Sequence, residues 1–258
     1  MNEFTVELSI LWPALLAGLL VVASHVPLGQ QVFARGIVFI DLAIAQVAGL
    51  GVIAASSLGF PIEGWGAQAA AGLAALAGAL LLTWTERKRP EAQEALIGIL
   101  FVLASAMQIL LLANDPHGGE NLRELLSGQI LWVSDAHLLR TAILTAAFAL
   151  VWFRFRERIG RIGFYLVFAV MVMSSVQLVG VYLVFTSLIV PAVATYRLAA
   201  NRQLAVGYAL GGASYVAGLV LSVVTDLPSG AVIVWAMALL GLLVHLAGGR
   251  GQEAPPPG

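Results

Sequence analysis

Long apolar segments recur along the whole chain and constrain its fold more than any other feature of the sequence. A helix needs about 20 mostly apolar residues to cross the hydrocarbon core of a bilayer. Segments of this kind, separated by polar joins, are Leu8–Leu28, Gly36–Phe60, Ala67–Thr85, Ala95–Ala113, Leu138–Phe153, Ile162–Tyr196, Leu204–Val224 and Ser229–Ala247. An outer-membrane barrel would instead have strands of about ten residues with alternating polarity. The pattern therefore predicts an all-α, polytopic membrane protein.

The composition excludes several other classes of protein. Hydrophobic residues make up 60% of the 258 residues, and Asp, Glu, Lys and Arg together only 10%. Soluble domains have about 25% charged residues, so this chain cannot cover a water-exposed surface. The net charge of −1 provides no basic excess for binding nucleic acid. The absence of cysteine removes thiolate metal sites and cysteine nucleophiles.

The segment Ile162–Tyr196 decides the number of crossings. It has 35 residues, which is too long for one crossing, and polar residues between Ser174 and Gly180 offer a turn near its middle. If it crosses twice and the N-terminus lies outside, eleven of the 13 basic residues fall in cytoplasmic joins, where such residues are enriched. These eleven are Arg35, Arg87, Lys88, Arg89, Arg154, Arg156, Arg158, Arg161, Arg197, Arg202 and Arg250. We predict a bundle of about nine transmembrane helices in the cell (inner) membrane, with the N-terminus out and the C-terminus in.

The joins are too short to hold a separate soluble domain. We interpret residues 1–247 as a single transmembrane permease domain and residues 248–258 as a disordered tail. Glu3 and Glu7 precede the first span and no basic residue does, unlike in a signal peptide, so we expect this span to be retained. No G-x-x-x-x-G-K-[ST] phosphate loop occurs. The chain is thus predicted to be a transport protein and not an enzyme, with its energy supplied elsewhere.

Ionisable residues within spans are costly and by default suggest function. Asp41 lies several residues into the span that begins at Gly36, and Gln46 follows five residues later, about 140° further around a helix. Asp41 could line a pathway or serve as a structural hydrogen-bond partner for a neighbouring helix. His25 and His245 lie near the ends of their spans, where an interfacial or internally bonded histidine is the alternative to a metal ligand.

Two further groups of residues have both a functional and a structural interpretation. Asp115, His117 and Glu120 combine carboxylates and imidazole, which suit zinc or manganese, but the surrounding Pro and Gly residues are equally typical of a solvated turn. The other group consists of four arginines that either orient the protein in the membrane or face a cytoplasmic partner: Arg154, Arg156, Arg158 and Arg161.

Several stretches resemble the zinc/manganese permease subunits of ABC importers. The most specific is Val179–Thr195, which is similar to the family's Val-Gly…Ser-Leu-Leu-Ile-x-Pro-Ala-x-x-Thr pattern in residue type and spacing. Asp41–Gly51 resembles the motif of the family's second span, and Asp226–Gly230 resembles an Asp-x-Pro-x-Gly before the final span. Together with Leu126–Ser134, these stretches keep the family's order over most of the chain.

The resemblance implies a permease for divalent metal ions, with zinc favoured over manganese or iron. It implies a permease dimer, two cytoplasmic ATP-binding subunits and an extracytoplasmic metal-binding protein as partners, and no cofactor besides the transported metal. It also implies a transport pathway lined by Asp41, Gln46, Ser187 and Pro191. Pro191 would free a backbone carbonyl and break its helix beside a pathway, or simply kink it.

The chain departs from the family's pattern in two places. Family members have a His four residues after the Asp, on the same helical face. Here Gln46 stands at the position of that His when Gly51 is aligned, and Asp41 falls one residue early. The segment Arg154–Ile162 is shorter than the family's coupling helix, so we expect a shorter contact with the ATPase, assisted by Glu86–Glu94. The alternative function is a gradient-driven secondary transporter or channel, although only Pro191 suggests the broken helices of such folds.

Overall fold

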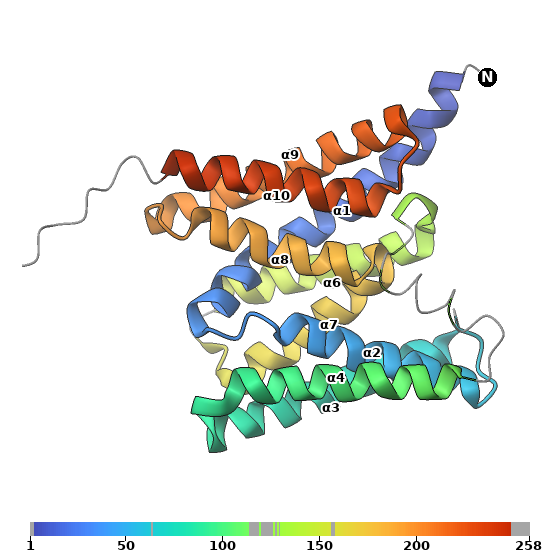
Figure 1. The fold of residues 1–258 in the computed structure, drawn as a ribbon, viewed down its shortest axis with the longest axis vertical. Helices are drawn as coiled ribbons and strands as arrows, with labels where there is room; N and C mark the ends of the chain where they lie inside the picture. Colours follow the sequence, from blue (N-terminus) through green and yellow to red (C-terminus); the bar gives the residue numbers. More distant parts are fainter. Residues whose placement is uncertain are drawn as a thin grey trace, which may run out of the picture.

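The computed structural model is a bundle of long helices that describes residues 3–62, 64–113, 119, 126, 128, 130–155 and 158–248, and the side chains from residue 11 onward. Figure 1 shows how the helices are arranged. In chain order they are α1 (Glu3–Arg35), α2 (Ile40–Ser57), α3 (Trp65–Lys88), the 3₁₀ turn η1 (Pro90–Ala92), α4 (Gln93–Leu112), the 3₁₀ turn η2 (Ile130–Trp132), α6 (Asp135–Phe155), α7 (Arg161–Val179), α8 (Val181–Thr195), α9 (Ala200–Thr225) and α10 (Ser229–Gly248). The described residues contain no strand, which confirms the predicted all-α class.

The number of membrane-crossing helices agrees closely with the apolar pattern. Eight helices in the described part of the chain are long and apolar enough to cross a bilayer, and α8 is a shorter apolar helix of 15 residues. The long segment Ile162–Tyr196 divides at Gly180, whose φ of 85° lies in a region that favours glycine. In Figure 1, α7 and α8 run in opposite directions from this point. The expected division of this segment into two helices with a turn between them is therefore confirmed, while a full crossing by α8 and the orientation across the membrane stay predictions.

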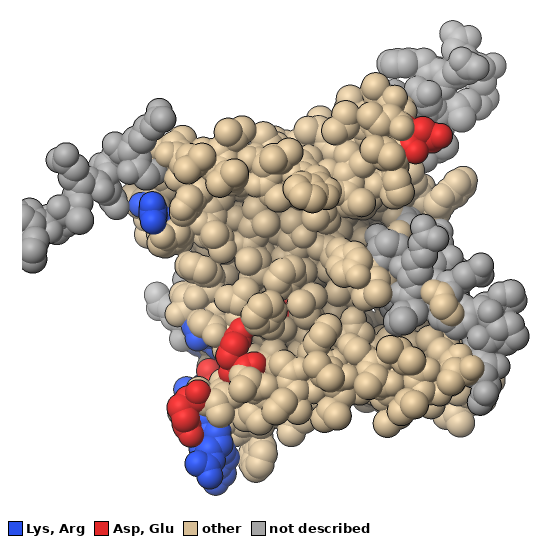
Figure 2. Space-filling view, in the orientation of Figure 1, with Lys and Arg blue, Asp and Glu red and all other residues tan. Residues whose placement is uncertain are grey.

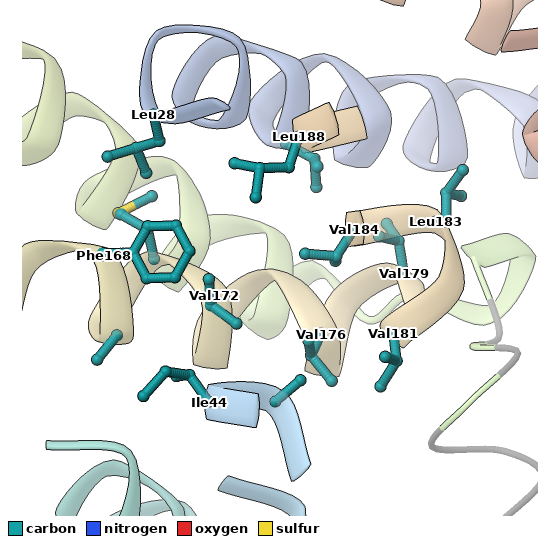
Figure 3. Packing of buried hydrophobic residues seen from close by; sticks show 14 of the residues in the cluster. Leu28, Ile44, Phe168, Val172, Val176, Val179, Val181, Leu183, Val184 and Leu188 are labelled. Atoms are coloured by element: carbon teal, nitrogen blue, oxygen red, sulfur yellow. The ribbon is translucent and has the colours of Figure 1, made fainter. Parts of the chain in front are cut away.

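Most of the helices form two groups with α7 between them, and α6 contacts α7 and α1. One group contains α1, α8, α9 and α10, and the other contains α2, α3 and α4 (Figure 1). Helix α7 contacts α2 and α3 on one side and α1 and α8 on the other. Figure 3 shows the apolar packing around it, where Phe168 and Val172 of α7 lie between Leu28 of α1 and Ile44 of α2. Side chains of α7 thus fill the space between the two groups.

Glycines permit very close contacts between helix backbones in the first group. A Cβ atom on Gly29 of α1 would collide with the carbonyl oxygen of Leu188 in α8. Gly207 and Gly211 of α9 face the side chains of Val26 and Val22 of α1, whose nearest methyl carbons lie 2.8 Å from a hypothetical Cβ. Helices in lipid associate largely through such packing, because lipid is as apolar as the side chains themselves.

Charged side chains gather at one end of the bundle. This end contains the last turns of α1, α3, α6 and α8 and the first turns of α2, α4, α7 and α9. On the face drawn in Figure 2, most coloured atoms lie at this end, and the long sides of the bundle are uncharged. The arrangement therefore brings together the described basic residues that the sequence assigned to the cytoplasmic side.

We predict that Gly29→Ala destabilises the protein, because the new methyl group would collide with the α8 backbone. Overpacking of this kind costs about 1–3 kcal/mol. The measurement is thermal unfolding of the purified variant in detergent. Gly98→Ala in α4 is the matched control, because nothing lies within 4 Å of its hypothetical Cβ. Equal unfolding midpoints for the two variants would contradict the close packing of α1 on α8.

Candidate functional site

Asp41 is the most unusual side chain in the described structure. It is 0% exposed, and neither of its carboxylate oxygens has a hydrogen-bond partner among the residues that the structure describes. A buried carboxylate without partners is costly, whereas nearly all buried polar groups are paired. The interpretation of Asp41 as a structural partner for a neighbouring helix therefore finds no support in its contacts. Its oxygens remain available for a cation or a proton.

The sequence placed Asp41 too far along its span. Helix α2 begins at Ile40, so Asp41 lies in its first turn and not several residues into the helix. The reason is that Gly36, with a φ of 67°, ends α1 in a capping turn: its N–H donates to Phe33 O at 3.1 Å, and Ile37 N–H donates to Val32 O at 3.3 Å. The residues from Gly36 to Phe39 therefore form the connection between α1 and α2. At the start of a helix, the backbone dipole favours a negative charge.

Gln46 is engaged by a neighbouring helix. The side-chain nitrogen of Gln108, in α4, donates to the Gln46 backbone oxygen at 2.8 Å and to its side-chain oxygen at 2.7 Å. Both glutamines are buried. The amide oxygen of Gln46, which would have to bind a metal, is already an acceptor in this link between α2 and α4. Sequence reasoning missed Gln108, although its signal was a polar residue in the middle of the apolar run Ala95–Ala113.

His25 lies deeper in its helix than the sequence indicated. Helix α1 continues for ten residues beyond it to Arg35, so His25 is not near the inner end of the span. The side chain is 0% exposed, and its Nδ1 lies 3.1 Å from Val21 O and 3.0 Å from Ser24 Oγ. Its Nε2 has no hydrogen-bond partner within the described residues. His245, by contrast, stacks on Tyr196 near the end of α10, with ring centroids 5.7 Å apart.

Ser187 and Pro191 lie on α8, and both are buried. Ser187 Oγ shares a hydrogen bond of 3.0 Å with the hydroxyl of Tyr215 in α9. Pro191 does not break its helix, because α8 runs without interruption from Val181 to Thr195. Thr195 Oγ donates to the Pro191 carbonyl at 2.7 Å, one turn further on. The interruption in this stretch is at Gly180, and Pro191 is an internal residue of a continuous helix.

The expected metal ligands do not come together in the described residues. No group of three or more His, Asp or Glu side chains that could hold a metal ion occurs among them. The cluster Asp115, His117 and Glu120 lies outside the described residues. The carboxylate of Asp41 is therefore the centre of the candidate site, without a complete set of metal ligands among the described residues.

The basic residues expected to face an ATPase lie at one end of the bundle. Arg154 is exposed in the last turn of α6, and Arg158 is exposed between α6 and α7. Arg161 begins α7, where its Nε lies 3.3 Å from a carboxylate oxygen of Glu86 in α3. Arg156 lies outside the described residues.

Eight described helices that are long and apolar enough to cross a bilayer define a multi-pass membrane protein, in which Asp41 is buried without a partner. The chain belongs to the ABC 3 transport family, whose model matches residues 7–162 and 155–248. It is therefore the membrane-spanning permease component of an ABC transporter, as the resemblance in sequence predicted.

Solved structures share this fold at low sequence identity. PsaBC from Streptococcus pneumoniae, solved in complex with Fab, contains a chain that is 22% identical. The match covers 91% of this chain and 90% of that one, with a TM-score of 0.74. A metal-chelate type ABC transporter in an inward-facing conformation is 17% identical, with 92% and 85% coverage and a TM-score of 0.67. At these identities, the likeness shows the fold.

We predict that Gln46 and Gln108 are energetically coupled. Gln108→Leu leaves the side-chain oxygen of Gln46 unpaired, and Gln46→Leu removes one of the two acceptors of the Gln108 amide, so we expect each variant to destabilise the chain. The double variant should lose less than the sum of the two, by about 0.6–1.7 kcal/mol, the range for such bonds in membranes. Unfolding free energies of the four proteins in detergent form the double-mutant cycle. Strict additivity would show that the amide link contributes nothing.

Proposed function

We propose that the chain imports divalent metal ions, zinc more than manganese, as the membrane-spanning subunit of an ATP-driven importer. The observation that carries the proposal is the buried, unpaired carboxylate of Asp41. A carboxylate is a suitable oxygen ligand for a divalent cation, and such a cation would offset the cost of burying it. Support also comes from the family motifs along the sequence and from the similar fold named as a metal-chelate type transporter.

The proposal includes a particular set of partners. Two copies of the chain would pair in the inner membrane, two cytoplasmic ATP-binding subunits would dock at the charged end of the bundle, and an extracytoplasmic protein would deliver the metal. The charge distribution supports the docking end, because exposed basic side chains collect there: Arg87, Lys88, Arg89, Arg154 and Arg158. The chain itself would hold no resident cofactor, since the metal is its cargo.

We predict that Asp41→Asn lowers metal uptake at least tenfold while the amount of protein in the membrane stays the same. Asn keeps the shape of the side chain but removes the charge that a cation requires. The measurement is uptake of ⁶⁵Zn by proteoliposomes that contain the complete transporter. Asp135→Asn is the matched control, because Asp135 also lies in the first turn of its helix but is exposed. Parallel loss of uptake and of membrane protein would assign Asp41 a structural role.

We predict that metal uptake requires ATP and the partner subunits. The purified chain alone should hydrolyse no ATP, because its sequence has no phosphate loop. Proteoliposomes with the ATP-binding subunit and the binding protein should accumulate metal only when ATP is present. Uptake by the lone chain under an ion gradient would contradict the proposal and favour the secondary transporter or channel.

A further inference from the structure

The connection that leads into Asp41 is held at both of its ends. Arg35, the last residue of α1, places its guanidinium 4.0 Å from the ring centroid of Phe164 in α7. At the other end, the backbone N–H of Phe39 donates to a carboxylate oxygen of Glu94 in α4 at 3.3 Å. The ring of Phe39 also stacks on Phe185 of α8, with centroids 6.2 Å apart. The position of Asp41, two residues after Phe39, therefore depends on the first turns of α4 and α7.

These two first turns are linked to each other through Gln93. Its side-chain nitrogen donates to the Tyr165 hydroxyl at 3.3 Å and to the Leu82 carbonyl at 3.0 Å. Its side-chain oxygen accepts from the Thr85 hydroxyl at 2.9 Å. Gln93, Tyr165 and Thr85 are all buried. Buried polar groups with their partners in place fix the geometry of the elements that they join.

The first turn of α7 follows directly on the segment that faces the proposed ATPase. Phe155 ends α6 and Arg161 begins α7, so only a few residues separate the charged loop from Phe164 and Tyr165. Arg161 also pairs with Glu86 at 3.3 Å, which joins this turn to the end of α3. A displacement of the loop would therefore reach α3 and α4 through direct contacts.

We propose that Glu94, Gln93 and Tyr165 are positioning residues that transmit movement of the α6–α7 loop to Asp41. The inference rests on the proposed function, because it assumes an ATP-binding partner that moves this loop. A shift of Tyr165 displaces Gln93, and the adjacent Glu94 moves with it. Because Glu94 accepts the hydrogen bond of the Phe39 N–H, Phe39 then moves as well. Packed elements of this kind move as units between discrete arrangements. Asp41 thus changes position when the partner changes state, without touching the partner itself.

Variants of Glu94 separate this role from simple support of the fold. Glu94→Leu removes the acceptor of the Phe39 N–H, whereas Glu94→Gln keeps an oxygen acceptor. Asp135→Leu is the matched control, because Asp135 is an exposed carboxylate in the first turn of α6, at the opposite end of the bundle (Figure 1). Tyr165→Phe keeps the ring and removes the hydroxyl that binds Gln93.

The first measurement is the number of ⁶⁵Zn ions imported per ATP hydrolysed by the reconstituted transporter. We expect Glu94→Leu and Tyr165→Phe to lower this ratio at least fivefold, with ATP hydrolysis within twofold of the parent protein. Glu94→Gln and Asp135→Leu should keep the parent ratio within twofold. Proportional loss of uptake and hydrolysis in Glu94→Leu, or failure of Glu94→Gln to restore the ratio, would overturn the proposal.

The second measurement does not depend on the cargo. The chain has no cysteine, so Val38→Cys introduces a single thiol in the connection before Asp41. We expect the rate of its modification by a maleimide to differ at least threefold between the nucleotide-free and ATP-bound transporter, and Glu94→Leu to abolish this difference. An equal rate in both states would overturn the inference. A preserved, Glu94-dependent difference in a transporter that imports no zinc would refute the proposed cargo and leave the inference standing.

Discussion

The structure depends on one constraint: its polar groups must form hydrogen bonds where no water is available. Inside the hydrocarbon core of a bilayer, a polar group without a hydrogen-bond partner in the protein stays unpaired. Several buried side chains meet this requirement by pairing between helices: Gln46 with Gln108, Gln93 with Tyr165, Ser187 with Tyr215, and Thr141 with Ser174. These pairs join α2 to α4, α4 to α7, α8 to α9 and α6 to α7. Against this background, Asp41 stands out among the described residues as a fully buried carboxylate with neither oxygen paired, and it needs a functional explanation.

The hydrogen-bonded pairs make some contacts between helices rigid, whereas the apolar contacts between other helices can be rearranged. The two groups of helices meet across α7 through apolar side chains such as Leu28, Ile44 and Phe168. Apolar contacts have no directional requirement and can be rearranged at lower cost than a buried hydrogen bond. The polar links between α7 and the group of α2, α3 and α4 cluster at the charged end, where Gln93 and Arg161 lie. The proposed ATP-binding partner would therefore act at the end of the bundle where α7 is held most firmly to α3 and α4.

The class of fold was predictable because apolar length is a strong and local signal. The division of the segment Ile162–Tyr196 into two helices followed from its length, from the polar residues and glycine near its middle and from the placement of basic residues. The depths of Asp41 and His25 were predicted wrongly because hydropathy does not mark helix ends. The positive φ of Gly36 ends α1 seven residues beyond Leu28, the last residue of the apolar run.

The contacts of the candidate site were less accessible from the sequence. Asp41 was recognised as unusual because a carboxylate in an apolar run is rare. Its lack of a partner, and the link between Gln46 and Gln108, depend on which helices are neighbours, and residues 62 positions apart carry no local signal of their contact. The same holds for Gln93 and Tyr165, which join helices that are distant in sequence.

The reversal at Gly180 also bears on how the chain enters the membrane. Helix α8 has 15 residues and spans about 22 Å, less than the roughly 30 Å of the hydrocarbon core. A single glycine joins it to α7, and the carbonyl of Val179 lies against Gly128 of the preceding segment. No hydrophilic loop separates the two helices. We therefore expect them to enter the bilayer together as a hairpin, with the protein around α8 compensating for its short length.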